Sequence, residues 1–145
     1  MTVKSHDKLV GLTVTHVIKY DRESLTLVFN STHLEKTYGW DEEESLCNAV
    51  TLTHHQDCCE SVWLEDICGD LEDFIDAKIL TFEEISETMP TAYESGTWTF
   101  YRIQTTKGEV VLRWCGESNG YYSERVDVDW TYVDVDNLEK GVHEH

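Results

Sequence analysis

The last third of the chain most strongly constrains the fold, because polar and apolar residues alternate there in segments separated by glycine-bearing turns. Thr97 to Thr105 and Glu109 to Cys115 alternate in this way, with Lys107 and Gly108 between them. A period of two is typical of a half-buried strand, and a short glycine-containing connection is typical of a hairpin. These segments predict an antiparallel meander, continued after a turn at 118–120 by a third strand over 121–132. Five apolar residues share the parity expected to face the core: Trp98, Phe100, Val110, Leu112 and Trp114.

The same signals occur earlier in the chain. Residues 11–20 alternate and are followed, after a turn-like Asp21 to Glu23, by a second strand over 24–29, which predicts another hairpin. His16 lies on the apolar parity of its strand and is expected to be a buried, hydrogen-bonded histidine. Further strands are expected at 49–53, 61–67 and 78–86. Residues 70–76 predict one short helix, capped by Asp70, with its apolar residues on one face. The fold class that follows is α+β, mostly β, an antiparallel sheet or meander with one short helix.

Length and composition predict a single domain. The chain has 145 residues, of which 40% are hydrophobic, enough for one packed core. We expect the domain to span residues 1–145, with an exposed acidic loop at 37–48 and a flexible tail at 134–145. The sequence contains no apolar run near the roughly 20 residues that cross a bilayer, and its start lacks the apolar stretch of a secretory signal. We therefore expect a cytoplasmic protein with free thiols and no membrane partner.

The negative charge is regional. Residues 41–94 hold sixteen acids against Lys78 (net −15) and residues 127–145 hold six against Lys140 (net −5), whereas 1–40 and 95–126 each sum to +1, giving −18 in all. Such a field repels phosphates, so direct binding of nucleic acid is not expected. The acidic block is either a solvated face or a surface that imitates nucleic acid. The second hypothesis places an interaction surface at four consecutive acids: Asp41, Glu42, Glu43 and Glu44.

A cluster of histidines and cysteines occupies residues 54–59. Imidazole and thiolate are zinc ligands, which makes zinc the one cofactor that the sequence suggests, with five candidate ligands: His54, His55, Asp57, Cys58 and Cys59. The cluster has no Cys-x-x-Cys spacing, and neighbouring strand residues point to opposite faces. The alternatives are a loop with one buried cysteine and one buried histidine, and a nucleophilic Cys–His pair, which the surrounding acids disfavour. Without zinc, no cofactor is expected and no catalytic residue is assigned.

A third group of residues lies in the near-neutral segment 95–126. Arginine forks bind phosphate and aromatic faces stack on rings, so this segment suits a small phosphorylated, ring-bearing ligand. The opposing interpretation is that the aromatic residues are core and the arginines pair with surface acids. The candidate ligand-binding residues are Arg102, Arg113, Arg125, Trp114, Asn119, Tyr121 and Tyr122.

Two long stretches carry a family resemblance. HHQDCCESVWLEDICGDLEDFI and ESGTWTFYRIQTTKGEVVLRWCGESNGYYSE, within residues 50–128, resemble a family of small uncharacterised proteins found mainly in tailed-phage genomes. The resemblance implies a setting and no mechanism: an accessory protein acting in the cytoplasm of an infected host cell. The loop at 37–48 and the segment after Asp129 depart from the family and are treated as specific to this chain.

Two classes of function remain open on the sequence alone. The first is a non-enzymatic binder that sequesters a small nucleotide-like signal of host defence. The second is an acidic inhibitor that blocks a basic groove of a host DNA-binding or nuclease protein; a zinc-binding domain is a further alternative. The expected partner is accordingly a small nucleotide-like ligand or a host protein, and exposed edge strands favour a homo-oligomer.

Overall fold

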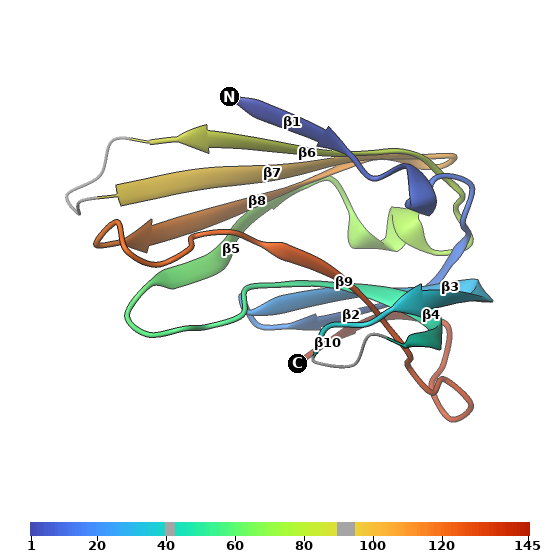
Figure 1. Cartoon of the computed structure of the whole chain (residues 1–145). Coiled ribbons are helices and arrows are strands. Elements are labelled where there is room, and N and C mark those ends of the chain that lie inside the picture. Colours follow the sequence, from blue (N-terminus) through green and yellow to red (C-terminus); the bar gives the residue numbers. More distant parts are fainter. Residues whose placement is uncertain (40–42, 90–94) are drawn as a thin grey trace.

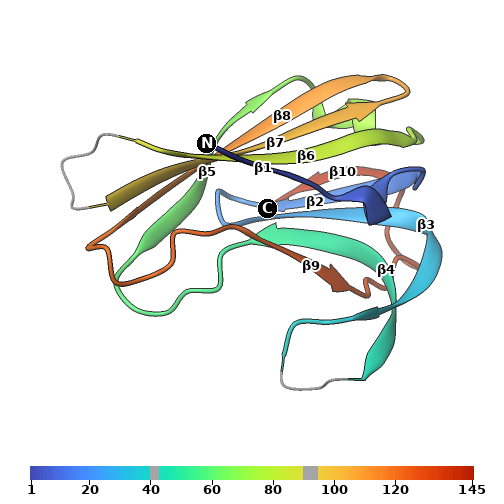
Figure 2. The same ribbon diagram turned by 45° about the horizontal axis from the view of Figure 1, so that its top comes forward.

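The computed structural model describes residues 1–39, 43–89 and 95–145 and contains two five-stranded sheets packed face to face (Figures 1 and 2). The first sheet has the order β1-β6-β7-β8-β5 and the second β10-β2-β3-β4-β9. The strands are β1 Thr2–Ser5, β2 Val14–Tyr20, β3 Ser24–Lys36, β4 Glu44–Thr53, β5 Ser61–Cys68, β6 Ile79–Thr88, β7 Ser95–Thr105, β8 Gly108–Ser118, β9 Asp127–Thr131 and β10 Gly141–Glu144.

The first two strands of the meander predicted for the last third are present as the antiparallel hairpin β7–β8, and β6 pairs antiparallel with the other edge of β7. Val110, Leu112 and Trp114 face the core and are fully buried, as expected. The prediction for Trp98 and Phe100 was wrong. The inner face of β7 carries Thr99, Tyr101 and Ile103, so both aromatic residues point outward and are only half-buried. Both faces of β7 carry apolar residues, and alternation alone does not say which one is covered.

The segment after β8 also departs from the prediction. In place of a third meander strand over 121–132, the chain leaves the first sheet at Ser118, crosses the end of the sandwich, and forms β9 against β4 in the second sheet. The C-terminal segment, expected to be a flexible tail, ends in β10, which pairs in parallel with β2. By pairing with β4 and β2, the strands β9 and β10 satisfy their own backbone N–H and C=O groups. The alternation of residues within one segment does not show which strand edge that segment will pair with.

The predicted helix is replaced by a single 3-10 turn. Residues Leu71–Phe74 form η2, and Asp70 caps it as expected by accepting a hydrogen bond from the backbone N–H of Glu72 at 3.0 Å. A second turn, η1, spans Asp7–Leu9. A four-residue segment between two strands makes too few hydrogen bonds to offset the cost of nucleating an α-helix. None of the helical segments in the described ranges could cross a membrane.

The expected acidic loop is shorter than the sequence suggested. β3 continues to Lys36 and β4 begins at Glu44, so that Lys36 lies opposite Glu44 in the ladder. Cys47 and Asn48, placed in the loop by sequence, are buried strand residues. Of the four consecutive acids proposed as an interaction surface, Asp41 and Glu42 lie outside the described residues, and Glu43 and Glu44 are exposed.

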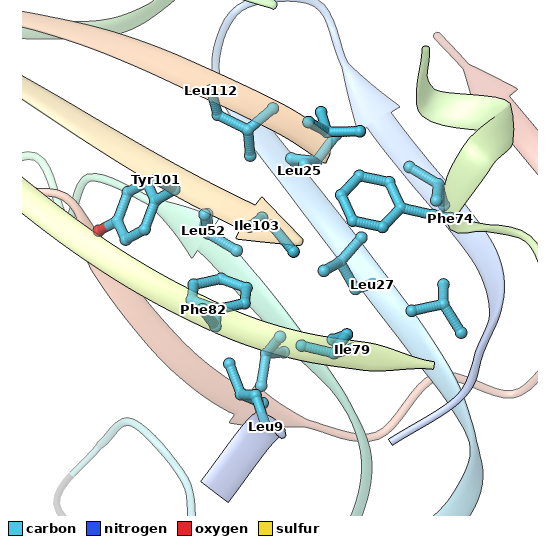
Figure 3. Packing of buried hydrophobic residues seen from close by; sticks show 14 of the residues in the cluster. Leu9, Leu25, Leu27, Leu52, Phe74, Ile79, Phe82, Tyr101, Ile103 and Leu112 are labelled. Carbon is cyan, nitrogen blue, oxygen red and sulfur yellow. The ribbon is translucent and has the colours of Figure 1, made fainter. Parts of the chain in front are cut away.

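The core lies between the two layers and contains side chains from both sheets and both 3-10 turns (Figure 3). Leu25 and Leu27 of β3 face Tyr101 and Ile103 of β7, and Phe74 of η2 closes one end. Fully burying a leucine or phenylalanine side chain stabilises a fold by about 1.5–3 kcal/mol, so this cluster is the main stabilising contribution. His16 is buried, as predicted, and its Nε2 lies 3.0 Å from the carbonyl oxygen of Leu138.

Candidate functional site

A cleft opens between the two layers beside the edge strands β1 and β9. Its floor is apolar, formed by Val50, Val128 and Trp130, and its volume is about 300 Å³. Its rim carries three basic side chains, from Lys4 of β1, from His6 and from Lys8 of η1, together with Ser5, Asp7 and Leu9. We call it the basic cleft. An aromatic floor with a cationic rim is uncommon in a chain with 29 acids and 11 bases.

The cations of the basic cleft have different surroundings. Lys8 is 73% exposed in its side chain, and its Nζ lies 3.0 Å from a carboxylate oxygen of Glu35. Lys4 lies in β1 opposite Glu84 of β6, and its positive charge helps to lower the pKa of the Glu84 carboxyl. Exposed pairs of this kind contribute little to stability, so a multiply charged anion could displace Glu35 at small cost.

A hydrogen-bonded wall closes the inner end of the basic cleft. His6 Nε2 lies 3.2 Å from Oε1 of Glu84, and the Tyr101 hydroxyl donates to the same oxygen at 2.7 Å. Burial opposes ionisation of Glu84, but the bonds from His6 and Tyr101 outweigh it and lower the pKa of the carboxyl. Burial and the adjacent Glu84 charge raise the pKa of Tyr101. The wall therefore holds a fixed negative charge in the neutral pH range.

A second cleft, also of about 300 Å³, lies beyond this wall. It occupies the inner face of β6 and β7 where the crossing segment after β8 covers them, and we call it the hydroxyl cleft. Hydroxyl groups dominate its lining, together with two carboxylates and one guanidinium: Glu84, Ser86, Ser95, Thr97, Thr99, Tyr122, Ser123, Glu124 and Arg125. The basic and hydroxyl clefts meet at the His6–Glu84 pair.

Glu124 anchors the crossing segment to the first sheet. Its carboxylate accepts hydrogen bonds from Thr97 Oγ1, at 2.7 Å, and from Ser118 Oγ. Burial opposes its ionisation, but hydroxyl donors from Ser118, Ser95 and Thr97 outweigh this and lower the pKa of Glu124. The glycine at position 116 allows Glu124 to pack closely against β8, because a Cβ at that position would lie 2.9 Å from both the Cβ and the carbonyl oxygen of Glu124.

The structure separates the ligand-binding residues proposed from sequence. Arg125 and Tyr122 line the hydroxyl cleft, although Arg125 is 76% exposed and pairs with Asp127 at 2.9 Å. Trp114 is fully buried in the core and its parity places it on the face opposite Arg113. Asn119 and the exposed Tyr121 form the turn after β8, in which the Asn119 side chain accepts a hydrogen bond from the Tyr121 backbone.

Arg102 and Arg113 lie on the outer face of the first sheet, away from both clefts. Arg102 Nε lies 3.1 Å from Glu109, and the Arg113 guanidinium lies 3.7 Å from Asp66 and 5.0 Å from the centroid of Trp98. The interpretation in which arginines pair with surface acids therefore describes these two residues. The seven proposed residues occupy the outer face, the core, a turn and a cleft, so they do not form one site.

The histidine–cysteine cluster forms a loop organised by Glu60. This buried carboxylate accepts hydrogen bonds from His54 Nε2 at 3.1 Å and from the backbone N–H of Cys58 at 2.8 Å. Burial opposes the ionisation of Glu60, and these donors outweigh it and lower the pKa of the carboxyl. The other ring nitrogen of His54 lies 2.6 Å from the carbonyl oxygen of Arg125, so the loop also holds the crossing segment.

The five candidate zinc ligands have other partners. His55 Nε2 lies 2.5 Å from Asp129, and its ring stacks on Tyr38. Cys58 and Cys59, expected to be free thiols, are joined by a disulfide. Asp57 donates its backbone N–H to Glu60. Within residues 1–39, 43–89 and 95–145, no group of three or more histidine, cysteine or acidic residues has the arrangement of a metal site.

Sequence reasoning missed every residue of the basic cleft and, in the hydroxyl cleft, every lining residue except Tyr122 and Arg125. Lys4, His6 and Lys8 recur at every second position near the start of the chain, and this concentration of basic residues is a signal that the sequence does contain. The structure places Lys4 in β1 and Lys8 in η1. Glu84 and Glu124 had no such signal, because their role depends on partners in β1, β7 and β8 that are distant in sequence.

A family model described as a domain of unknown function (DUF7448) matches residues 7–128, and the chain belongs to this family. The matched range includes Lys8, the hydroxyl cleft and the histidine–cysteine loop, and it ends before Trp130. No curated protein and no solved structure matches the chain.

Proposed function

We propose that this member of the DUF7448 family is a non-enzymatic binding protein that holds a small nucleotide-like ligand in the two clefts on the open side of its sandwich. The proposal keeps the ligand class inferred from sequence but moves its site from the outer arginines to the interlayer clefts. The observation that carries it is the basic cleft, in which three cationic or protonatable side chains surround an apolar, aromatic floor.

The chemistry of the basic cleft suits a phosphorylated ring. Lys4 and Lys8 offer ammonium donors to phosphate oxygens, and hydrogen bonds to charged groups contribute about 1.5–3 kcal/mol each. Val50, Val128 and Trp130 give an apolar surface on which a planar ring loses its contact with water. The acidic remainder of the chain disfavours large polyanions, which supports a small ligand over a nucleic acid.

The hydroxyl cleft suits the sugar of such a ligand. Carboxylates and hydroxyls accept and donate the hydrogen bonds that ribose hydroxyls need, as an acidic side chain does for ribose in dinucleotide-binding folds. Each cleft has a volume of about 300 Å³, at the lower end of the usual range of ligand sites, and the two meet at the His6–Glu84 pair. The resemblance of residues 50–128 to phage proteins supports a setting in an infected cell, where binding would withhold a nucleotide-like signal of host defence.

The test is calorimetric titration with three probes: ADP, adenosine, which lacks phosphate, and pyrophosphate, which lacks the ring. We expect ADP to bind more tightly than either fragment. The double variant Lys4→Ala with Lys8→Ala should weaken ADP binding about tenfold or more, since one charged hydrogen bond contributes at least 1.4 kcal/mol. The matched control removes the same charge from two exposed lysines outside both clefts, Lys36→Ala with Lys140→Ala, and should bind ADP like the parent.

Two results would overturn the proposal: no binding of ADP at millimolar concentration, or equal binding by the Lys4/Lys8 variant and the parent. If ADP fails and the protein instead binds a basic host protein in a salt-sensitive manner that Glu43→Gln with Glu44→Gln abolishes, the acidic inhibitor becomes the better hypothesis.

A further inference from the structure

A disulfide joins two neighbouring residues, Cys58 and Cys59, in the loop between β4 and β5. Both residues are exposed, and exposed disulfides exchange readily with thiols in solution. In an extended chain neighbouring side chains point to opposite faces, so the bond requires a turn at these two residues. The two cysteines are therefore accessible to a reactant, and their bond is coupled to the shape of the loop.

This disulfide adds little to the stability of the fold. A cross-link stabilises a protein mainly by restricting the unfolded chain, and its effect grows with the length of the loop that it closes. Cys58 and Cys59 are adjacent in the sequence, so almost no chain is enclosed. The other three cysteines are free, and two of them, Cys47 and Cys115, lie buried in strands. A bond that is exposed and joins no distant segments is suited to reversible formation rather than to structural support.

The carboxylate of Glu60 fixes the same turn. Its oxygens accept hydrogen bonds from the backbone N–H groups of Cys58, at 2.8 Å, and Asp57, at 3.3 Å. Successive N–H groups of an extended chain point in opposite directions, so both reach one carboxylate only where the chain turns. The Gln56 side chain adds a hydrogen bond to the carbonyl oxygen of Cys58, at 3.2 Å. The disulfide and the Glu60 hydrogen bonds therefore depend on one backbone conformation, and breaking the disulfide weakens these hydrogen bonds.

A buried histidine connects Glu60 to the crossing segment, residues 119–126, which lies beside the loop in both views of the chain (Figures 1 and 2). His54 Nε2 lies 3.1 Å from Glu60, and its Nδ1 lies 2.6 Å from the carbonyl oxygen of Arg125. The side chain of His54 is 5% exposed and that of Glu60 is fully buried, so the loss of either bond leaves a buried polar group unpaired. Movement of Glu60 therefore changes a contact that holds the crossing segment in place.

We propose that Cys58 and Cys59 are a reversible redox site that exchanges with dithiols, and that reduction of this site loosens the crossing segment through Glu60 and His54. A thiolate of the dithiol attacks one sulfur of the pair, forms a mixed disulfide and releases the other cysteine as a thiolate. The second thiolate of the dithiol then attacks the mixed disulfide, releases the remaining cysteine and closes the disulfide of the reagent. Two electrons pass from the dithiol to the pair, and the two protons of the dithiol end on the two cysteines. The site is independent of the proposed ligand.

The first experiment reduces the folded protein with dithiothreitol, a small dithiol, and counts its thiols by alkylation in denaturant and intact-mass measurement. It uses the Cys68→Ser variant, which removes the third exposed cysteine. The oxidised chain should show two thiols, those of Cys47 and Cys115, and the reduced chain four. Excess oxidised glutathione should return the count to two.

The rate of this reduction shows whether the folded chain exposes the disulfide. Reduction of the folded protein should be within about tenfold of the rate for the urea-unfolded chain. A disulfide that reacts only after global unfolding would be reduced at least about a thousandfold more slowly, since that factor is the lower limit of ordinary folding equilibria.

The second experiment compares amide hydrogen exchange in the two redox states. Reduction should accelerate exchange about tenfold in residues 57–58 and 123–126, since the loss of one buried hydrogen bond shifts local opening by about that factor. Amides in the middle of β7, residues 101–103, should exchange equally in both states. The matched control is Cys58→Ser in the same background, which cannot form the bond and should exchange like the reduced chain with either reagent.

Three results would overturn the proposal. A thiol count that stays at two in excess dithiothreitol without urea would show a protected, structural disulfide. A count that stays at four in excess oxidised glutathione would show that the two cysteines do not pair. Equal exchange of residues 123–126 in the two redox states would show that the pair does not act on the crossing segment.

Discussion

At the scale of single residues, three glutamate carboxylates hold segments of the fold together; Glu60 and Glu124 are buried, and Glu84 is half-buried. Glu60 binds the loop of residues 54–60 to itself, Glu84 connects β6 to His6 and Tyr101, and Glu124 connects the crossing segment to β7 and β8. Each accepts hydrogen bonds from several donors, which is the condition under which a buried charge is tolerated. From composition alone, these residues would be taken for surface acids. In the structure, their hydrogen bonds hold segments of the fold together.

Gly116→Ala should destabilise the protein through the Glu124 contact. The added Cβ would lie 2.9 Å from backbone and side-chain atoms of Glu124, so the crossing segment must move away from β8. Overpacking of this kind costs about 1–3 kcal/mol in the free energy of unfolding. Urea denaturation measures it, with the neighbouring Glu117→Ala, whose side chain faces outward, as the control. Equal stability of the Gly116 variant and the parent would show that Glu124 does not hold the segment closely.

At the scale of elements, the two short C-terminal strands complete the second sheet on opposite edges. β9 pairs with β4 and carries Val128 and Trp130 into the floor of the basic cleft, while β10 pairs with β2. Parallel pairing of β10 with β2 leaves Val142 packed against the core. Both edge strands of the second sheet therefore come from the C-terminal part of the sequence.

Deletion of residues 141–145 should lower the free energy of unfolding by about 1.5 kcal/mol or more, since it removes the burial of Val142 and a row of ladder hydrogen bonds. Hydrogen exchange should accelerate at the amides of β2 that β10 protects. Glu144→Ala changes only an exposed side chain of β10, leaves its backbone pairing with β2 in place, and is the control. If exchange in β2 is the same in the truncated chain and the parent, β10 does not pair with β2 in solution.

At the scale of the whole molecule, the acids act in two opposing ways. A net charge of −18 destabilises the compact state by self-repulsion, and protonation of exposed carboxylates relieves it. Glu60, Glu84 and Glu124 act in the opposite direction, because the folded state lowers their pKa values below the ordinary value. A carboxyl with a lowered folded pKa stabilises the fold above its unfolded value, and that stability is lost as the pH falls through the folded value.

We therefore expect the free energy of unfolding to fall as the pH drops below about 4.5, the ordinary value of a glutamate. Urea denaturation between neutral pH and about pH 3 measures the curve. Glu124→Gln should flatten the acid limb, because its amide does not titrate, whereas the exposed Glu87→Gln should leave the curve unchanged. An acid limb equally steep in all three proteins would remove Glu124 as one of its causes.

The sequence itself determined the local elements. Alternation and glycine-bearing turns correctly placed the β2–β3 hairpin, the β7–β8 hairpin, the capping role of Asp70 and the buried His16. These features depend on residues within a few positions of one another or on burial that one strand's pattern reveals. The ligand class also came from the sequence, and it stays a prediction.

Only the tertiary structure decided which faces are covered and which residues meet. Trp98 and Phe100 were assigned to the core because both faces of β7 are apolar, and the choice between the faces depends on where the second sheet packs. The crossing segment left the meander because β4 offered an edge to β9. The clefts join Lys4, Glu84 and Arg125 from three distant segments. Local patterns cannot specify these contacts, because the contacts form only when the two sheets pack together. Each sheet contains strands that are far apart in the sequence.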